Sequence, residues 1–511
     1  MKYLILAGII FFTVFIHHFP TYYALLKTPS NTSFSGQAAW FDPWDTNVYV
    51  SAIKEGQNGN LLYSNQFTTI KHKPLFVYTF YTLTGLLFNN VDPYSLFQIE
   101  SLIFSALLVV GTFLLSGSFI KSIKVRQYAT ILIVLGGGIG WMIYPYLSLP
   151  DMTIPAFIFH EGFHRPHIAF DLLFYISSLI VFYKAISLNK NFFYIASCLL
   201  ITPSLIIHPF MIVIYGLIIL SYALFIYKKY STSSGLIYSV FILVFLFFFE
   251  LLLVKHLLSS TGFGSLMSEQ IVSPNIIFII LGFGLIGAFA SLSIRYFYKK
   301  DEITFLIIWV VSSLLAAMIP VGFRVFFLRG IFLPVTILSI YGLGYAAKRL
   351  KLHLKIPIIA IYIIVLFISL GSTFRIFYIR TSEAGKTNQW FYVPDETLQA
   401  INYFSTSRKN VLSAMYFGNL LPVFTDSKSF YGHPQVTSNA DEKLFFLHLF
   451  YANKLQNSEI KQYLTKNNIE YIVYGPEEVE ISKLYDNIDG IKYPELKSVY
   501  KNKTVEIYKV Q

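Results

Sequence analysis

The chain has 511 residues, of which 55% are hydrophobic, 18% are aromatic and only 13% are charged. This balance excludes an ordinary soluble protein and indicates a chain whose solvent is the lipid bilayer, where aromatic residues suit lipid-facing helices and interfaces. The formal net charge of +12 does not indicate nucleic-acid binding, because the basic residues stand in short runs between apolar segments, where membrane topology places them.

Apolar segments dominate the first 372 residues, and a helix needs roughly 20 apolar residues to cross a bilayer. Segments of this kind begin near residues 4, 95, 128, 168, 192, 209, 236, 276, 303, 331 and 356. The first has no small-residue cleavage site, so we expect it to remain as an anchor. The pattern predicts a mainly α, polytopic helical bundle with about eleven spanning helices.

The basic runs between these segments indicate the orientation of the bundle. They lie near residues 121–126, 190, 228–229, 295–300 and 348–351. Two crossings separate each run from the next, so all of them can lie in the cytoplasm together with the N-terminus, which leaves the chain after residue 372 outside. The apolar segment 75–88 is short and bounded by Pro74 and Asn89, so we expect it to lie along the outer interface.

The composition becomes polar after residue 372. Short apolar runs typical of strands lie at residues 411–412, 471–474 and 504–508. Asp395 and Glu396 are suited to the start of a helix. The sequence therefore predicts a membrane-embedded domain of residues 1–372 and a small extracytoplasmic α/β domain of residues 373–511.

The first long polar loop carries acidic residues that could meet a substrate. Asp42 and Asp45 flank Pro43-Trp44, and Tyr49 follows four residues after Asp45. A glycine-rich turn comes next, and residues 73–75 read Lys-Pro-Leu. On spacing alone, Asp45 would be the N-cap of the helix that carries Tyr49.

Two further signals stand at the ends of apolar segments. Asp171 opens one segment, and an ionisable residue there is costly enough in a membrane to indicate a function. A carboxylate that stabilises a helix N-terminus is the structural alternative. Arg324 and Arg329 precede a Leu-Pro pair in a loop placed outside, against the positive-inside trend. Guanidinium groups that bind a phosphate would explain them, and so would interfacial anchoring.

In this order, the three stretches resemble motifs of the GT-C glycosyltransferases, in particular the protein O-mannosyltransferases and the lipid A aminoarabinose transferases. The matching residues are Asp45, Tyr49, Lys73, Pro74 and Leu75 in the first loop, Asp171 before Leu172 and Leu173, and Arg329 before Leu333 and Pro334. The resemblance covers the chain to about Pro334, and the tail matches by placement only.

The resemblance implies an inverting transfer of a sugar from a polyprenyl-phosphate-linked donor to an acceptor outside the cytoplasm. Asp45 would be the general base that accepts the acceptor's proton. Asp171 would be the second acid, with Asp42 in reserve. The leaving phosphate needs charge stabilisation rather than a proton. Its binding residues would be Arg324, Arg329 and Lys73.

His160, Glu161 and His164 form the H-E-x-x-H pattern of zinc proteases. That chemistry needs both histidines on one helical face, but Pro155 and Pro166 leave room for only a short helix, and no third ligand motif is evident. The loop is placed outside, where its side chains could line a substrate cavity. The residues predicted for this cavity are Tyr49, His160, Glu161, His164, Arg165, His167 and His208.

We therefore predict a multi-pass cell-membrane glycosyltransferase. Its partners would be the lipid-linked donor, a lipid, glycan or protein acceptor, and the bilayer. A transporter or flippase of lipid-linked saccharides and an intramembrane zinc metalloprotease stay open as alternatives. No cofactor is required by the pattern, and the single cysteine, Cys198, excludes a cysteine-based metal site. Two carboxylates could hold Mg²⁺ or Mn²⁺, although no closed ligand set is visible.

Overall fold

The computed structural model describes residues 2–39, 41–258, 275–321, 323–354, 357–487 and 490–511. The chain divides into two compact units. The helical unit comprises residues 1–22, 98–254 and 270–382, and the mixed unit comprises residues 23–97, 255–269 and 383–511. The first polar loop therefore belongs to the same unit as the C-terminal tail.

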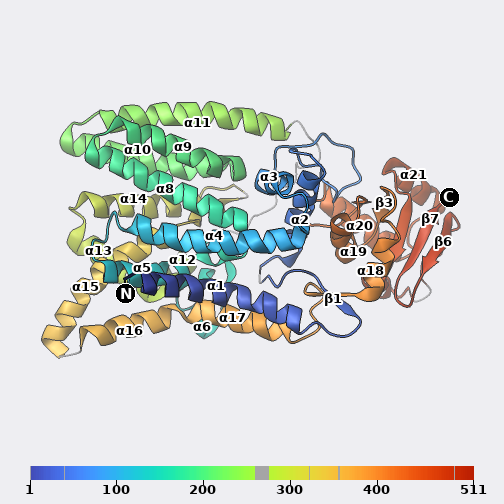
Figure 1. Cartoon of the computed structure of the whole chain (residues 1–511). Coiled ribbons are helices and arrows are strands. Elements are labelled where there is room, and N and C mark those ends of the chain that lie inside the picture. The colour runs from blue at the N-terminus through green and yellow to red at the C-terminus, as the bar shows by residue number, and fades with distance from the viewer. Residues whose placement is uncertain (1, 40, 259–274, 322, 355–356, 488–489) are drawn as a thin grey trace. The chain divides into compact units, whose positions relative to one another are not determined.

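Long apolar helices make up most of the helical unit (Figure 1). In the described residues, seven segments are long and apolar enough to cross a membrane, or up to eight if the bent pair α12 Ile276–Gly282 and α13 Gly284–Phe297 is one span. The seven are α1 Lys2–Leu26, α4 Pro93–Ser116, α8 Pro166–Leu188, α10 Met211–Tyr230, α11 Ser234–Leu258, α15 Phe332–Leu354, and α16 Ile358–Ser369 continued by α17 Gly371–Ala384. The protein is a multi-pass membrane protein, as predicted.

The eleven predicted crossings all fall on helices, but not all of these helices have spanning length. The three short ones are α5 Ile123–Leu135, α9 Asn191–Ile207 and α14 Asp301–Ala317. They have 13, 17 and 17 residues. At about 1.5 Å per residue they rise about 20 to 26 Å, less than the roughly 30 Å of a hydrocarbon core. By length and composition, the part of the chain that the structure describes therefore holds seven or eight candidate spans, where the sequence predicted about eleven.

Segment 75–88 does not form a spanning helix, as predicted. Its helix, α3 Thr79–Leu87, has nine residues and rises only about 13 Å. It packs directly on α2 Pro43–Gln57, and two glycines make this approach possible. A Cβ on Gly56 or Gly85 would lie 2.1 or 2.0 Å from a carbonyl oxygen of the other helix. Contact with the helix of the first polar loop therefore holds α3 in place.

The C-terminal part of the mixed unit contains a five-stranded sheet of order β4-β3-β5-β7-β6. Its strands are β3 Asn410–Leu412, β4 Lys428–Ser429, β5 Tyr471–Tyr474, β6 Leu496–Lys501 and β7 Glu506–Val510. β3 runs parallel to β4 and β5, whereas β7 runs antiparallel to β5 and β6. The accompanying helices are α18 Asp395–Asn402, α19 Met415–Phe424, α20 Ala440–Tyr451, α21 Asn457–Lys466 and α22 Pro476–Lys483. The predicted α/β fold, its three predicted strands and the helix start at Asp395 are confirmed.

A two-stranded ribbon joins the first polar loop to the beginning of the tail. β1 Thr32–Phe34 pairs antiparallel with β2 Tyr392–Pro394. Ser35 reinforces the ribbon, since its Oγ donates to the Trp390 carbonyl at 2.7 Å. Segments that lie more than 350 residues apart in the chain thus form one structure.

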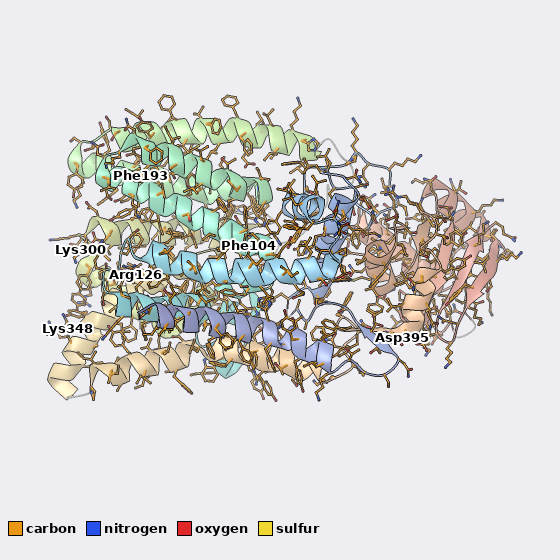
Figure 2. All side chains as sticks on the ribbon, viewed as in Figure 1. Phe104, Arg126, Phe193, Lys300, Lys348 and Asp395 are labelled. Carbon is orange, nitrogen blue, oxygen red and sulfur yellow. The ribbon has the colours of Figure 1, made fainter. Side chains whose placement is uncertain are left out.

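Basic side chains gather at one end of the helical unit. Figure 2 shows Arg126, Lys300 and Lys348 at the same end. Lys229 belongs to the same region, because its Nζ lies 2.6 Å from Oδ1 of Asp301. This arrangement is the one that the basic runs of the sequence predict for loops on a common side of a membrane.

The core of the helical unit contains side chains of α8, α10, α14 and α15. Tyr175 and Trp309 are fully buried there, with ring centroids 5.9 Å apart in an edge-on contact. By contrast, α11 leaves Phe245, Phe248 and Leu252 exposed. An apolar surface of this kind suits contact with lipid tails.

Candidate functional site

The first acidic site forms at the N-terminus of α2. Asp42 is the N-cap residue and Pro43 follows it, where the missing N–H of proline costs no hydrogen bond. Asp42 has φ 41°, and its exposed side chain makes no cap hydrogen bond. Asp45 stands in the first turn, so the interpretation of Asp45 as the helix cap is wrong. The helix dipole stabilises a carboxylate in this turn.

The carboxylate of Asp45 accepts two side-chain hydrogen bonds. Its Oδ1 lies 2.8 Å from Nε2 of His433, and its Oδ2 lies 3.4 Å from the hydroxyl of Tyr49. Nδ1 of His433 accepts from the backbone N–H groups of Gln435 and Val436, both at 3.1 Å. The proton of the neutral imidazole must then reside on Nε2, where it is donated to Asp45. The side chain of Asp45 remains 16% exposed, so the carboxylate is in contact with solvent.

Backbone contacts hold the loop that carries His433. Oγ1 of Thr437 accepts from the N–H groups of Gly432 and His433, and it donates to the Phe67 carbonyl at 2.8 Å. Nδ2 of Asn65 donates to the Val436 carbonyl at 2.8 Å. His433 was not among the predicted site residues. Its signal in the sequence is only a histidine between a glycine and a proline in a polar, aromatic turn.

Two other predicted residues of the first loop have different surroundings. The ring of Tyr49 is buried and stacks on Tyr81 with centroids 4.9 Å apart, so only its hydroxyl reaches Asp45. Lys73 has an exposed side chain on the same unit. Tyr49 therefore supports the carboxylate, and Lys73 is accessible to an anionic ligand.

The second acidic site is buried in the helical unit around Asp171 of α8. Its Oδ2 lies 3.3 Å from Nη1 of Arg329 and 2.9 Å from Nδ1 of His208, and its Oδ1 accepts from the hydroxyl of Ser204. Burial lowers the pKa of His208, and the charge of Arg329 lowers it further against the opposing effect of Asp171. His208 is therefore a neutral donor, and Arg329 balances the charge of Asp171.

Glu161 extends this network. Its Oε1 lies 3.0 Å from Nη1 of Arg165, and its Oε2 lies 3.5 Å from Nη2 of Arg329. The ring of His167 lies beside that of His208, with centroids 5.7 Å apart. Two carboxylates and two guanidinium groups leave the network without net formal charge. The structure thus brings together the predicted residues Glu161, Arg165, His167, Asp171, His208 and Arg329.

Arg324 has surroundings unlike those of Arg329. The 3₁₀ helix η3 Arg324–Leu328 leads through Gly330 into α15, and Gly330 has φ 79°, which other residues rarely adopt. Both Nη atoms of Arg329 face carboxylates. Arg324 is half-buried and forms no ion pair with any carboxylate in the described part of the chain. Of the two arginines predicted to bind the phosphate, Arg324 is the one whose charge is not balanced by a carboxylate of the described residues.

His160 and His164 lie at the 3₁₀ helix η1 Phe159–Phe163 and not on an α-helix. Their ring centroids are 4.6 Å apart. Both oxygens of Glu161 face arginines, so Glu161 is not placed as the general base of a zinc protease, which counts against that alternative. His17 of α1 joins the two histidines, although the sequence showed no third ligand motif. Among the described residues, these three side chains are the one group of potential metal ligands whose donor atoms all lie within 4.8 Å.

Comparisons with known proteins bear on the fold. No family model matches the sequence, and no curated protein matches it. The oligosaccharyltransferase of Archaeoglobus fulgidus in the apo form is 11% identical, with 95% of this chain and 71% of that chain covered and a TM-score of 0.59. The same archaeal enzyme, AglB, in complex with an inhibitory peptide and a dolichol-phosphate is 12% identical, with 92% of this chain and 70% of that chain covered and a TM-score of 0.54. ArnT from Cupriavidus metallidurans in the apo state is 10% identical, with 98% of this chain and 98% of that chain covered and a TM-score of 0.51.

At these sequence identities the likeness concerns the fold. It extends over nearly the whole chain and includes the C-terminal tail, which the sequence motifs did not cover. The GT-C-type membrane fold that the motifs of the first loop, Asp171 and Arg329 predicted is confirmed.

Proposed function

We propose that this protein is an inverting membrane glycosyltransferase that moves a sugar from a polyprenyl-phosphate-linked donor to an acceptor outside the cytoplasm. The observation that carries the proposal is the carboxylate of Asp45, which stands in the first turn of α2 and is oriented by His433. The GT-C-type fold supports it, as does the structure of AglB with a dolichol-phosphate, a lipid of the proposed donor class.

In this reaction Asp45 is the general base. An acceptor hydroxyl attacks C1 of the sugar, and its proton passes to the carboxylate of Asp45 as the new C1–O bond forms. The bond between C1 and the phosphate oxygen breaks on the opposite face, and its electron pair leaves with the lipid phosphate. His433 holds the carboxylate through its Nε2–H, and Tyr49 holds the other oxygen. One displacement inverts the configuration at C1.

The leaving phosphate needs positive charge and no proton. We assign this role first to Arg324, whose guanidinium is not engaged by a described carboxylate, and second to the exposed Lys73. Arg329 has a positioning role, because its contacts with Asp171 and Glu161 tie α8 and η1 to the loop that carries Arg324. This differs from the sequence interpretation, which included Arg329 among the residues that bind the phosphate.

The proposed orientation follows from the basic end of the helical unit. Arg126, Lys300 and Lys348 lie at that end, and we assign it to the cytoplasm by the positive-inside rule. The N-terminus would then be cytoplasmic and the tail extracytoplasmic. The donor would be consumed on the outer side of the membrane.

Purified protein in detergent, supplied with defined polyprenyl-phosphate sugars and a panel of hydroxyl acceptors, tests the proposal. We expect release of polyprenyl phosphate together with a glycosylated acceptor of inverted configuration. A flippase would move the same lipid from one leaflet of a proteoliposome membrane to the other without cleaving its sugar–phosphate bond. Movement without release of polyprenyl phosphate would therefore replace the proposed function with that alternative.

A further inference from the structure

Three histidines from two distant parts of the sequence meet inside the helical unit. His17 lies on α1, His160 lies in η1, and His164 follows directly after η1. The ring centroid of His17 lies 4.8 Å from that of His160 and 5.3 Å from that of His164. One nitrogen from each ring lies within 4.8 Å of the other two. None of the three histidines takes part in the hydrogen bonds and ion pairs described above for Asp171.

Hydrogen bonds join His164 to His17 and to Arg380, but the three neutral rings together also have the chemistry of a metal site. His17 and His160 are buried, so three imidazolium charges cannot coexist there, and each neutral ring carries a lone pair. Nδ1 of His17 lies 3.4 Å from Nε2 of His164. Nε2 of His17 is buried and makes no hydrogen bond with any described residue. Neutral imidazole is the most common protein ligand of transition metals.

The separations of the nitrogens suit tetrahedral coordination after a small adjustment. Zn–N bonds of about 2.0 to 2.1 Å place ligand nitrogens about 3.3 Å apart. The contact between His17 and His164 is already 3.4 Å. The widest separation in the group, at most 4.8 Å, needs to shorten by about 1.5 Å, which side-chain rotation can supply.

Arg380 of α17 determines which charge a fourth ligand of such a metal site should carry. Its Nη1 donates to the His17 carbonyl at 2.7 Å and lies 3.1 Å from Nε2 of His164. A guanidinium beside a bare divalent cation is repulsive, whereas a cation that carries an anionic ligand is attracted to it. Three histidine ligands leave one tetrahedral position open. An anionic oxygen ligand in that position would offset the repulsion between the cation and the charge of Arg380.

We propose that His17, His160 and His164 bind one transition-metal ion of the zinc class, with the fourth position open to an anionic oxygen ligand. The site does not depend on the proposed sugar transfer. It is also distinct from a zinc protease centre, because the carboxylate of Glu161 is engaged by Arg165 and Arg329.

Metal binding to the full-length protein in detergent tests the proposal. Protein stripped with a chelator and reloaded with Zn²⁺ should retain about one equivalent after desalting, measured by inductively coupled plasma mass spectrometry. His17→Ala and His160→Ala should each weaken Zn²⁺ binding by at least about 100-fold, since loss of a mere supporting residue already costs 10- to 100-fold. Binding equal to that of the parent in both variants would overturn the site.

His18→Ala is the matched control. His18 is the neighbour of His17 on α1 and is equally buried, but its Nε2 pairs with Oγ of Ser105 at 3.1 Å. This variant should keep the metal. Because a histidine variant could fail to fold, the Zn²⁺-loaded parent provides an independent readout by X-ray absorption. Three imidazole nitrogens at about 2.0 to 2.1 Å are expected, and a shell made only of oxygen would refute the assignment.

Discussion

The substitution Asp45→Asn separates a catalytic carboxylate from a structural one. Asparagine has the same shape, and its oxygen can accept from Nε2–H of His433 while its amide donates to the hydroxyl of Tyr49. Both contacts of the parent therefore survive. What is lost is the negative charge, and with it the ability to accept the proton of the acceptor.

The structural contacts set the size of the expected effects. A hydrogen bond to a charged group contributes about 1.5 to 3 kcal/mol and a neutral one about 0.5 to 1.5 kcal/mol, so the contact with His433 weakens by about 1 kcal/mol. Loss of the charge in the first turn of α2 costs a further 0.3 to 1 kcal/mol, roughly. The transfer rate should fall about 10²- to 10⁴-fold, equivalent to about 3 to 5 kcal/mol of barrier. Activity should thus decline far more than stability.

The assay is single-turnover transfer from a defined polyprenyl-phosphate sugar, with the free energy of unfolding and donor binding measured on the same preparations. Asp42→Asn is the matched control, because the exposed N-cap tolerates asparagine as well as aspartate. If Asp45→Asn keeps more than about a tenth of the parent rate, Asp45 is not the general base. In a double-mutant cycle, His433→Ala should slow the parent but have little further effect on Asp45→Asn.

Three other predictions concern the arginines, the buried lysine Lys443 and the membrane topology. Arg324→Ala should weaken donor binding without loss of fold. Arg329→Ala should instead destabilise the protein by about 3 to 5 kcal/mol, because it leaves buried carboxylates without their partner. Isothermal titration calorimetry and thermal unfolding distinguish the two effects, and the reverse pattern would return the phosphate role to Arg329. Burial lowers the pKa of Lys443 from 10.5 to about 7, so between pH 7 and about 10 the unfolded chain binds more protons than the folded one, and stability should rise with pH. Lys443→Met should remove this rise in chemical unfolding experiments, and an unchanged slope would contradict the assignment. Cysteines placed at Asn58 and Asn89 should react with an impermeant reagent from outside the cell, and reaction of the second only from the cytoplasm would refute the topology.

The sequence by itself determined the features that depend on short stretches of chain. The long apolar helices follow from the composition of about 20 consecutive residues, which decides partition into lipid without reference to the rest of the protein. The start of α18 at Asp395 and the strand β5 at residues 471–474 follow from equally local patterns. Asp171 could be singled out because an ionisable residue near the end of a membrane helix is costly, whereas Asp45 was singled out by the resemblance of the first loop to the GT-C motifs.

Only the tertiary structure decided which side chains meet. His433 reaches Asp45 across 388 positions, Arg329 reaches Asp171 across 158, and His17 reaches His164 across 147. No local pattern encodes such pairs, because they arise from the packing of whole elements and from loops whose backbone bonds are made elsewhere. The same holds for the lengths of α5, α9 and α14, where the apolar run continues but the backbone turns. Hydrophobicity decides which segments enter the lipid or the protein core. Hydrogen bonds and close packing between distant segments decide where a helix ends and which charged side chains form pairs.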